Sequence, residues 1–179
     1  MKTLYIGSRI EALIILELFL KSNDLEAPMI YTPINSRIQI DRKNNNLIYY
    51  DRKNKNETLK KLSDILIQNS FDLVISVGFN FLIPKEILDD NINTVFINSH
   101  PHLLPKWKGN NAIKESVLEG ETEYGCTVHY IDEKMDNGPI ISQEKIKVHN
   151  SEQHLIYKFL FEFVEPITIY NALKSLNNV

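Results

Sequence analysis

Residues 94–101 read Thr-Val-Phe-Ile-Asn-Ser-His-Pro, a run that turns from apolar to polar within a few positions. The segment from Thr94 to Ile97 is typical of a buried strand, and Asn98 and His100 follow at its carboxyl end. Alternate residues of an extended segment point to the same side, so the amide and the imidazole should share a face. The stretch therefore predicts a central strand that ends in two chemically active side chains.

Strand and helix patterns alternate on both sides of this strand. We expect strands at 3–6, 29–31, 73–78, 124–131 and 139–148, and helices at 9–21, 57–68, 84–88, 110–119 and from Ser151 onward. Such alternation predicts an α/β fold with a mostly parallel, right-handed central sheet flanked by helices. Ligands of such sheets bind beyond the carboxyl ends of the strands, which is where Asn98 and His100 fall. Because no linker rich in Pro, Gly or Ser divides residues 1–179, we expect a single domain.

Composition argues against several classes of protein. The 179 residues are 43% hydrophobic and 24% charged, close to a globular average, and the net charge of -3 argues against nucleic-acid binding. Cys126 is the only cysteine, so no intrachain disulfide is expected and the cytoplasm is the expected location. No membrane association is expected, since the apolar run 13–20 is too short to span a bilayer. Arg9 and Glu11 interrupt the N-terminal run that would otherwise look like a signal peptide.

A carboxylate within a turn completes the polar set, at Asp136-Asn137-Gly138. The Asn98 amide could donate to an oxyanion, and His100 could take a proton from an attacking amine. Asp136 could orient the imidazole and stabilise its protonated form. Taken singly, an Asn-x-His after a strand and an Asp-Asn-Gly are more typical of capped turns. Together they predict acyl transfer to an amine.

The combined segments resemble the formyltransferase family that uses formyl-tetrahydrofolate. The family pattern is Asn-x-His-Pro-Ser-Leu-Leu-Pro-x-aromatic-basic-Gly, then Gly-x-Thr-x-His, then Asp-x-Gly, and it is matched by residues 98–109, 125–129 and 136–138. The resemblance implies a Rossmann-like fold, 10-formyltetrahydrofolate as co-substrate, and Asn98, His100 and Asp136 as the catalytic residues. His102 departs from the pattern, where the family usually has serine; it could be a surface turn residue or an altered substrate contact.

By the same resemblance, two segments should hold the folate. One is the loop after the strand at 73–78, and the other is the loop that carries Asp136. Apolar side chains suit a flat heterocycle whose edge is read by backbone groups. Without the motif, the first loop would be interpreted as an ordinary turn in the core. The implied folate-binding residues are Phe79, Asn80, Phe81, Leu82, Ile83, Ile131, Asp132, Met135 and Gly138.

A further set of residues is implied for the acceptor: Lys106, Trp107, Lys108, Gly109 and Asn110. The Trp107 ring could stack on a sugar or base while the lysines meet phosphate, and an exposed loop anchor is an equally good interpretation. The diphosphate of a nucleotide-linked substrate could also meet basic residues of the polar stretch 35–57, such as Arg37, Arg42 and Arg52.

The branch of the family is inferred from loop sequences. The first expected strand ends in Ile6-Gly7-Ser8-Arg9-Ile10, whereas the purine-pathway members have a Gly-x-Gly-Ser-Asn phosphate loop there. Members that act on tRNA carry a further C-terminal domain, whereas this chain ends one helix after the expected core, so tRNA is not expected as a partner. Residues 79–85 and 106–111 look more like the sugar-nucleotide branch. That branch implies N-formylation of a nucleotide-linked deoxyamino sugar, in bacterial lipopolysaccharide or O-antigen synthesis.

Two alternatives stay open. One is glycinamide ribonucleotide formyltransferase activity, and the other is a non-catalytic domain that binds folate or a nucleotide sugar. His100, His102 and His129 could together hold a metal in principle, but their spacing is not diagnostic and no metal is expected. His129 is expected to support the site, and Cys126 to be an inert structural residue. The last helix carries apolar residues beyond one stripe, which mildly favours a homodimer: Phe159, Phe161 and Phe163.

Overall fold

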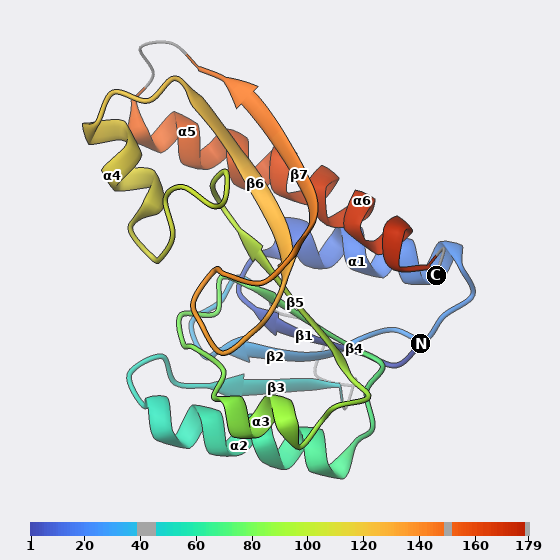
Figure 1. The fold of residues 1–179 in the computed structure, drawn as a ribbon. Coiled ribbons are helices and arrows are strands. Elements are labelled where there is room, and N and C mark those ends of the chain that lie inside the picture. Colours follow the sequence, from blue (N-terminus) through green and yellow to red (C-terminus); the bar gives the residue numbers. More distant parts are fainter. Residues whose placement is uncertain (39–45, 149–151, 178–179) are drawn as a thin grey trace.

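The computed structural model describes residues 1–38, 46–148 and 152–177. Within these residues, seven strands form one sheet in the order β3-β2-β1-β4-β5-β6-β7 (Figure 1). In chain order the strands are β1 (Thr3–Gly7), β2 (Met29–Pro33), β3 (Leu47–Tyr50), β4 (Leu73–Val77), β5 (Val95–His100), β6 (Glu123–Tyr130) and β7 (Ile140–Lys147).

The pairing of the strands confirms the expected sheet. β1 to β5 pair in parallel, and β6 and β7 are added antiparallel at one edge. β1 and β4 are buried along their whole length, as expected for parallel strands covered on both faces. Parallel strands end at the same side of the sheet, so the loops after β1, β4 and β5 are brought close together.

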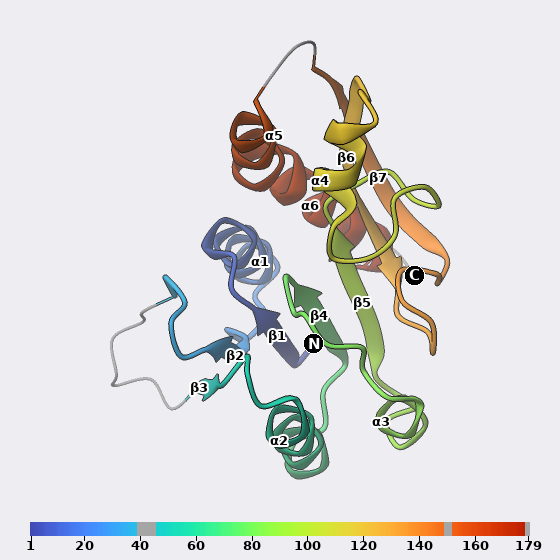
Figure 2. The ribbon, with the colours of Figure 1, turned by 90° about the vertical axis from the view of Figure 1, so that its left-hand side faces the viewer.

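Helices cover both faces of the sheet (Figure 2). On one face lie α1 (Ile10–Ser22) and α6 (Glu165–Asn177), and on the other lie α2 (Lys55–Gln68) and α3 (Lys85–Asp89). Two short helices, α4 (Ala112–Leu118) and α5 (Gln153–Phe159), share an apolar cluster with β6. Within the described ranges, no helix is both long and apolar enough to cross a bilayer.

Apolar side chains on the two faces of the sheet hold these layers together. Ile75 and Ile97 pack with the helices α1 and α6, whereas their neighbours Val74 and Phe96 pack with α2 and α3. This alternation follows from the period of two in a strand. Each fully buried side chain of this size contributes roughly 2 kcal/mol. The central strands are thus a rigid support for the polar residues at their ends.

Two segments differ from the sequence-based expectation. Residues 47–50, for which no strand is expected within the polar stretch 35–57, form the edge strand β3, which pairs with β2. The helix expected at 110–119 is shorter and covers Ala112–Leu118, because residues 110–111 form a turn beside the loop that follows β5.

The last helix is divided into three parts. Its expected start at Ser151 lies outside the described residues, and α5 and α6 are separated by a π-helical turn, Leu160–Val164. Pro166 lies two residues after this turn and has no backbone N–H to donate to it, which accounts for the widened helix. The turn places Phe161 beside the cavity described below.

Candidate active site

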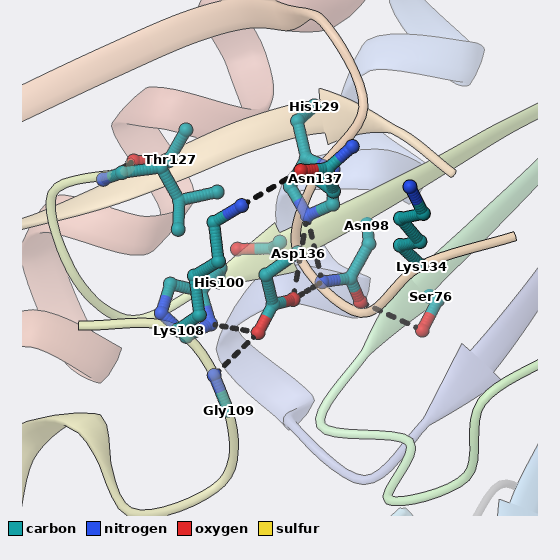
Figure 3. Close-up of polar contacts among 12 residues, drawn as sticks. Ser76, Asn98, His100, Lys108, Gly109, Thr127, His129, Lys134, Asp136 and Asn137 are labelled. Atoms are coloured by element: carbon teal, nitrogen blue, oxygen red, sulfur yellow. Dashed lines mark hydrogen bonds and ion pairs between the residues drawn. The ribbon is translucent and has the colours of Figure 1, made fainter. Parts of the chain in front are cut away.

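Three polar side chains form a row across β4, β5 and β6 (Figure 3). In the strand register Ser76 lies opposite Asn98, and Asn98 lies opposite His129, so the three side chains share a face. The Ser76 hydroxyl donates to Oδ1 of Asn98 over 2.9 Å, and Nδ2 of Asn98 lies 3.2 Å from Nε2 of His129. The row fixes the orientation of the Asn98 amide. Its oxygen faces Ser76, and its N–H groups face His129 and the loop between β6 and β7.

A second contact shows which ring nitrogen of His129 carries a hydrogen. Its Nδ1 lies 2.8 Å from the Tyr130 carbonyl oxygen, which can only accept, so Nδ1 carries a hydrogen. Nε2 of the ring faces Nδ2 of Asn98. His129 is buried, and this contact fits the supporting role expected for it.

Asp136 is held by an unusual backbone in the loop between β6 and β7. Its φ of 50° lies in the left-handed region, which costs a non-glycine residue about 1 kcal/mol. Two residues on, a Cβ at Gly138 would overlap the Tyr130 carbonyl oxygen, so only glycine lets the loop turn so close to β6. The Gly109 N–H donates to Oδ2 of Asp136 over 2.8 Å and ties this loop to the one after β5.

His100 lies between a carboxylate and a carbonyl. Its Nδ1 is 3.2 Å from Oδ2 of Asp136, and its Nε2 is 2.7 Å from the carbonyl oxygen of Trp107. Because the carbonyl can only accept, Nε2 carries a hydrogen. Burial lowers the pKa of His100, and the Asp136 carboxylate and the Trp107 carbonyl offset only part of this effect. A neutral His100 therefore has its lone pair on Nδ1, next to Asp136.

Asp136 is ionised at neutral pH. Burial by itself would raise the pKa of this carboxyl, but the contacts with His129, His100 and the Gly109 N–H together lower it below its usual value. Its Oδ1 lies 3.5 Å from Nε2 of His129 and 3.4 Å from Nδ2 of Asn98. The carboxylate is thus placed to stabilise a proton on either imidazole.

The three residues expected to be catalytic line one cavity of about 270 Å³. Most of the residues implied for folate binding line it too: Phe79, Asn80, Phe81, Leu82, Ile83, Ile131 and Met135. Asp132 and Gly138 do not line it. The Asp132 carboxylate instead accepts from the Lys134 N–H at 2.9 Å and from Asn137 Nδ2 at 3.1 Å, which braces the loop of Asp136.

The residues implied for the acceptor are divided by the structure. Gly109 and Asn110 line the cavity, whereas Lys106, Trp107 and Lys108 do not. Lys106 pairs with Glu121, and Lys108 donates to Oδ1 of Asn137 over 2.8 Å. Trp107 has a φ of 56° and contributes its carbonyl oxygen, not its ring, to the surroundings of His100.

Sequence reasoning missed a contact between Arg9, which lines the cavity, and the buried Glu165. Nε of Arg9, at the start of α1, lies 3.2 Å from Oε2 of Glu165, and the guanidinium lies 3.2 Å from the centre of the Phe161 ring. Glu165 is fully buried and its other oxygen accepts from the Ser99 hydroxyl at 2.9 Å. Burial raises the pKa of Glu165, and Arg9 and Ser99 oppose this shift. No local sequence signal connects residues 156 positions apart in this way.

His102 is neither a surface residue nor a lining residue of this cavity. It is 1% exposed, and its Nδ1 accepts from the Leu103 N–H over 2.8 Å. Burial lowers its pKa to about 4, so the ring is neutral. Within the described part of the chain, no group of three or more His, Cys, Asp or Glu side chains has an arrangement that could hold a metal ion.

The fold and the site together define an α/β transferase with an amide, an imidazole and a carboxylate at the carboxyl ends of its strands. The sequence profile of the family described as formyl transferase matches residues 26–173. The chain therefore belongs to the formyl transferase family, as the motif at 98–138 implied.

Individual relatives carry different names. The chain is 35% identical over 109 residues to a methionyl-tRNA formyltransferase of Wolbachia pipientis subsp. Culex pipiens (strain wPip), covering 60% of this chain and 35% of that protein. It is 40% identical over 96 residues to the methionyl-tRNA formyltransferase of Pelagibacter ubique (strain HTCC1062), covering 54% of this chain and 31% of that protein. The matched region thus spans about a third of the length of these curated relatives.

Solved structures share the fold across nearly the whole chain. Phosphoribosylglycinamide formyltransferase from Bacillus halodurans superposes with a TM-score of 0.79 at 21% identity, covering 98% of this chain and 95% of that one. A sugar N-formyltransferase from Shewanella sp. FDAARGOS_354 gives a TM-score of 0.74 at 18% identity, covering 99% and 71%. At these identities the likeness shows the fold alone.

Proposed function

We propose that this chain transfers a formyl group from 10-formyltetrahydrofolate to the amino group of a nucleotide-linked deoxyamino sugar. One observation carries the chemical part of this proposal: Asp136 contacts both Asn98 and His100, and the three residues line a single cavity. Membership of the formyl transferase family supports the formyl group and the folate donor.

Asn98 is suited to stabilise the oxygen that becomes negative when an amine adds to the formyl carbon. Its contact to Asp136 is long at 3.4 Å, so this N–H can turn toward a stronger acceptor at little cost. Ser76 and His129 hold the amide in place meanwhile. A well-aimed donor of this kind lowers the barrier by about 3–4 kcal/mol.

His100 is suited to take the proton that the amine loses. Its free lone pair is on Nδ1, 3.2 Å from Asp136, so a proton accepted there is stabilised at once by the carboxylate. The Trp107 carbonyl keeps the ring in this orientation through the hydrogen on Nε2. Acid–base assistance of this kind contributes roughly 10²- to 10⁴-fold in rate.

The lip of the cavity fits a flat heterocycle. Leu82 and Met135 leave 37% and 42% of their surface exposed although both are apolar, so core packing does not account for them. Phe81 also lines the cavity and stacks edge-on with Phe79, with ring centres 5.4 Å apart. Ile83, only 3% exposed, belongs to the core and would offer backbone groups instead.

The acceptor is inferred from the residues around the end of β1. The end of β1 and the loop that follows have a single glycine, Gly7, and an arginine, Arg9, unlike the phosphate loop of the purine-pathway members. Arg9 nevertheless supplies a positive charge to the lining of the cavity. These features support an acceptor that carries negative charge beyond its amine. The second candidate is the aminoacyl end of methionyl-tRNA, because the curated relatives described above are methionyl-tRNA formyltransferases.

A panel of acceptors tests the proposal. Tetrahydrofolate release would be measured with several nucleotide-linked amino sugars, with glycinamide ribonucleotide and with methionyl-tRNA, each at equal concentration. We expect at least one amino sugar nucleotide to have the highest kcat/KM. A higher kcat/KM for glycinamide ribonucleotide or methionyl-tRNA would overturn the acceptor assignment, and binding without turnover of any acceptor would favour a non-catalytic domain.

We further propose that the chain forms a homodimer through the outer face of its last helices. Large apolar side chains on this face are between 43% and 55% exposed: Leu155, Phe159, Phe163, Ile167 and Tyr170. Phe161, expected to belong to this face, lies at the cavity instead. Light scattering should show a dimer that Phe159→Glu converts to a monomer, whereas Ile67→Glu, at a 72% exposed position on α2, should not. A monomeric wild type would refute the dimer.

A further inference from the structure

A second cavity, of about 440 Å³, opens where β1, β2 and β3 end. These strands lie side by side at the edge of the sheet opposite to β7 (Figure 1). The described residues that line the cavity come from the ends of these strands and the loops that follow them: Ser8, Pro33, Ile34, Asn35, Ser36, Arg37, Tyr50, Asp51, Arg52 and Lys53. Arg42, another basic residue of the 35–57 stretch, lies outside the described residues. Nothing in the proposed chemistry of the Asn98 cavity uses this second cavity.

A buried hydroxyl in the lining of this cavity has no partner. Tyr50 is 3% exposed, and its ring packs against Tyr31 and Phe79 with centres 4.7 and 5.5 Å away. Its hydroxyl oxygen makes no hydrogen bond within the described residues. Burial raises the pKa of Tyr50 to about 12 and the nearby Arg52 guanidinium opposes only part of this effect, so the hydroxyl stays a neutral donor beside that arginine. A buried polar atom without a partner is costly, which makes it a candidate contact for a bound molecule.

The charge of the lining is positive although the chain as a whole is negative. Arg37, Arg52 and Lys53 contribute three cations against one carboxylate among the described lining residues, Asp51. Oδ1 of Asp51 already accepts from the Lys53 N–H at 2.9 Å. Nη2 of Arg52 donates to the Ser8 hydroxyl over 2.6 Å, which holds the guanidinium across the end of β1. This arrangement of donors suits an anion with several oxygens.

The two cavities adjoin. Ser8 of the second cavity precedes Arg9 of the first in the chain, and the ring of Tyr50 contacts that of Phe79, which lines the first. One extended molecule could therefore place an amine near His100 and an anionic group near Arg52. The lysines at 106 and 108, the other basic residues expected to meet phosphate, line neither cavity.

We propose that the second cavity binds the diphosphate of the acceptor, held by Arg52, Ser8 and the Tyr50 hydroxyl. The identity of the diphosphate as part of the acceptor rests on the proposed function. The carboxylates of a polyglutamate tail on the folate would present similar anionic chemistry to the same donors, so the test separates the two sources.

Isothermal titration calorimetry on the whole chain would measure the binding of each probe. The probes are UDP, dTDP, GDP and inorganic pyrophosphate on one side, and monoglutamyl and tetraglutamyl tetrahydrofolate on the other. At least one nucleoside diphosphate should bind the wild type and bind Arg52→Gln about tenfold or more weakly, since a charge-assisted contact is lost. Tyr50→Phe should weaken the same probe and raise the melting temperature of the free protein, because it removes an unpartnered polar atom. Lys60→Gln, at an exposed position on α2, is the matched control and should bind like wild type.

The outcomes separate this inference from the proposed function. Three results would each refute the diphosphate site. Wild type could bind no nucleoside diphosphate, Arg52→Gln could bind it as tightly as wild type, or Arg52→Gln could weaken only the binding of tetraglutamyl tetrahydrofolate. If Arg52→Gln weakens nucleotide binding but wild type never formylates an amino sugar nucleotide, the site stands and the proposed function fails. If such turnover occurs with the same KM in Arg52→Gln, the function stands and the site fails.

Discussion

The hydroxyl of Ser76, on β4, donates to Oδ1 of Asn98, on β5, over 2.9 Å. This bond determines which end of the Asn98 amide faces Asp136 and the cavity. Because Oδ1 already accepts from Ser76, the N–H groups point toward Asp136. Ser76→Ala removes the bond and lets the amide rotate. We expect kcat to fall about tenfold, ~1.4 kcal/mol of barrier, with KM nearly unchanged.

Steady-state kinetics would measure this effect. Ser175→Ala is the matched control, because that hydroxyl donates to the Asn171 carbonyl on the surface of α6, away from the cavity. A Ser76→Ala variant with full kcat would show that Asn98 needs no such support.

Removing the carboxylate beside His100 should change the pH dependence of the reaction. The Asp136 carboxylate raises the pKa of His100 against the larger lowering effect of burial. In Asp136→Asn the pKa of His100 should therefore fall further, so the imidazole stays neutral to lower pH. We expect the acid limb of the kcat profile to move to lower pH while the plateau falls by about 10² or more. A limb that moves to higher pH would contradict the role of Asp136.

The buried pair of Arg9 and Glu165 should matter for stability in a pH-dependent way. Arg9 opposes the effect of burial on the pKa of Glu165, so in Arg9→Leu this pKa rises further. Glu165 is neutral in both folded and unfolded states at low pH, and the cost of burying its charge grows as pH rises above the usual 4.5. Unfolding by urea should show a loss of roughly 3–5 kcal/mol near pH 8 and less near pH 5.

An exposed ion pair provides the control for this experiment. Arg37 and Glu11 pair at 3.4 Å with the arginine side chain 80% exposed, so Arg37→Leu should cost less than about 1 kcal/mol at either pH. An equal loss for Arg9→Leu at both pH values would mean that Arg9 acts only by packing on Phe161.

His102 should destabilise the fold in acid. Its folded-state pKa of about 4 lies below the usual 6.5, so the unfolded chain binds a proton that the folded chain does not. Stability is therefore lost as pH falls from about 6.5 to about 4, by roughly 3 kcal/mol in total. The loss of unfolding free energy between these pH values should be smaller in His102→Ser than in wild type. In the control His154→Ser, at an exposed position, the loss should equal that of wild type. An unchanged drop in His102→Ser would contradict the assignment.

Much of the architecture follows from local patterns. The apolar runs at 73–78 and 94–97 predicted buried strands, and their ends placed Asn98 and His100 where parallel sheets bind ligands. The strand at 47–50 was missed as a strand because a four-residue run in a polar stretch has too little periodicity to distinguish it from a loop.

The site was predictable only where its residues are close in sequence or fall in a motif. Ser76 reaches Asn98 only through the register of β4 against β5, which no local pattern reveals. The pairing of Arg9 with Glu165 depends on the packing of α6 against α1. Lys106 and Lys108 are expected to meet phosphate because of their charge, but charge alone does not reveal that Lys106 pairs with Glu121.

The most direct test of the central claim is a single-turnover measurement of the chemical step. Wild type and His100→Ala would be mixed with 10-formyltetrahydrofolate and the best amino sugar nucleotide, and the tetrahydrofolate and formylated sugar formed would be followed in time. We expect the two products in equal amounts with wild type. With His100→Ala the rate should be about 10² or more lower, while both ligands bind within about twofold of wild type. An unchanged rate in His100→Ala, or a wild type that binds both ligands and forms neither product, would contradict the account.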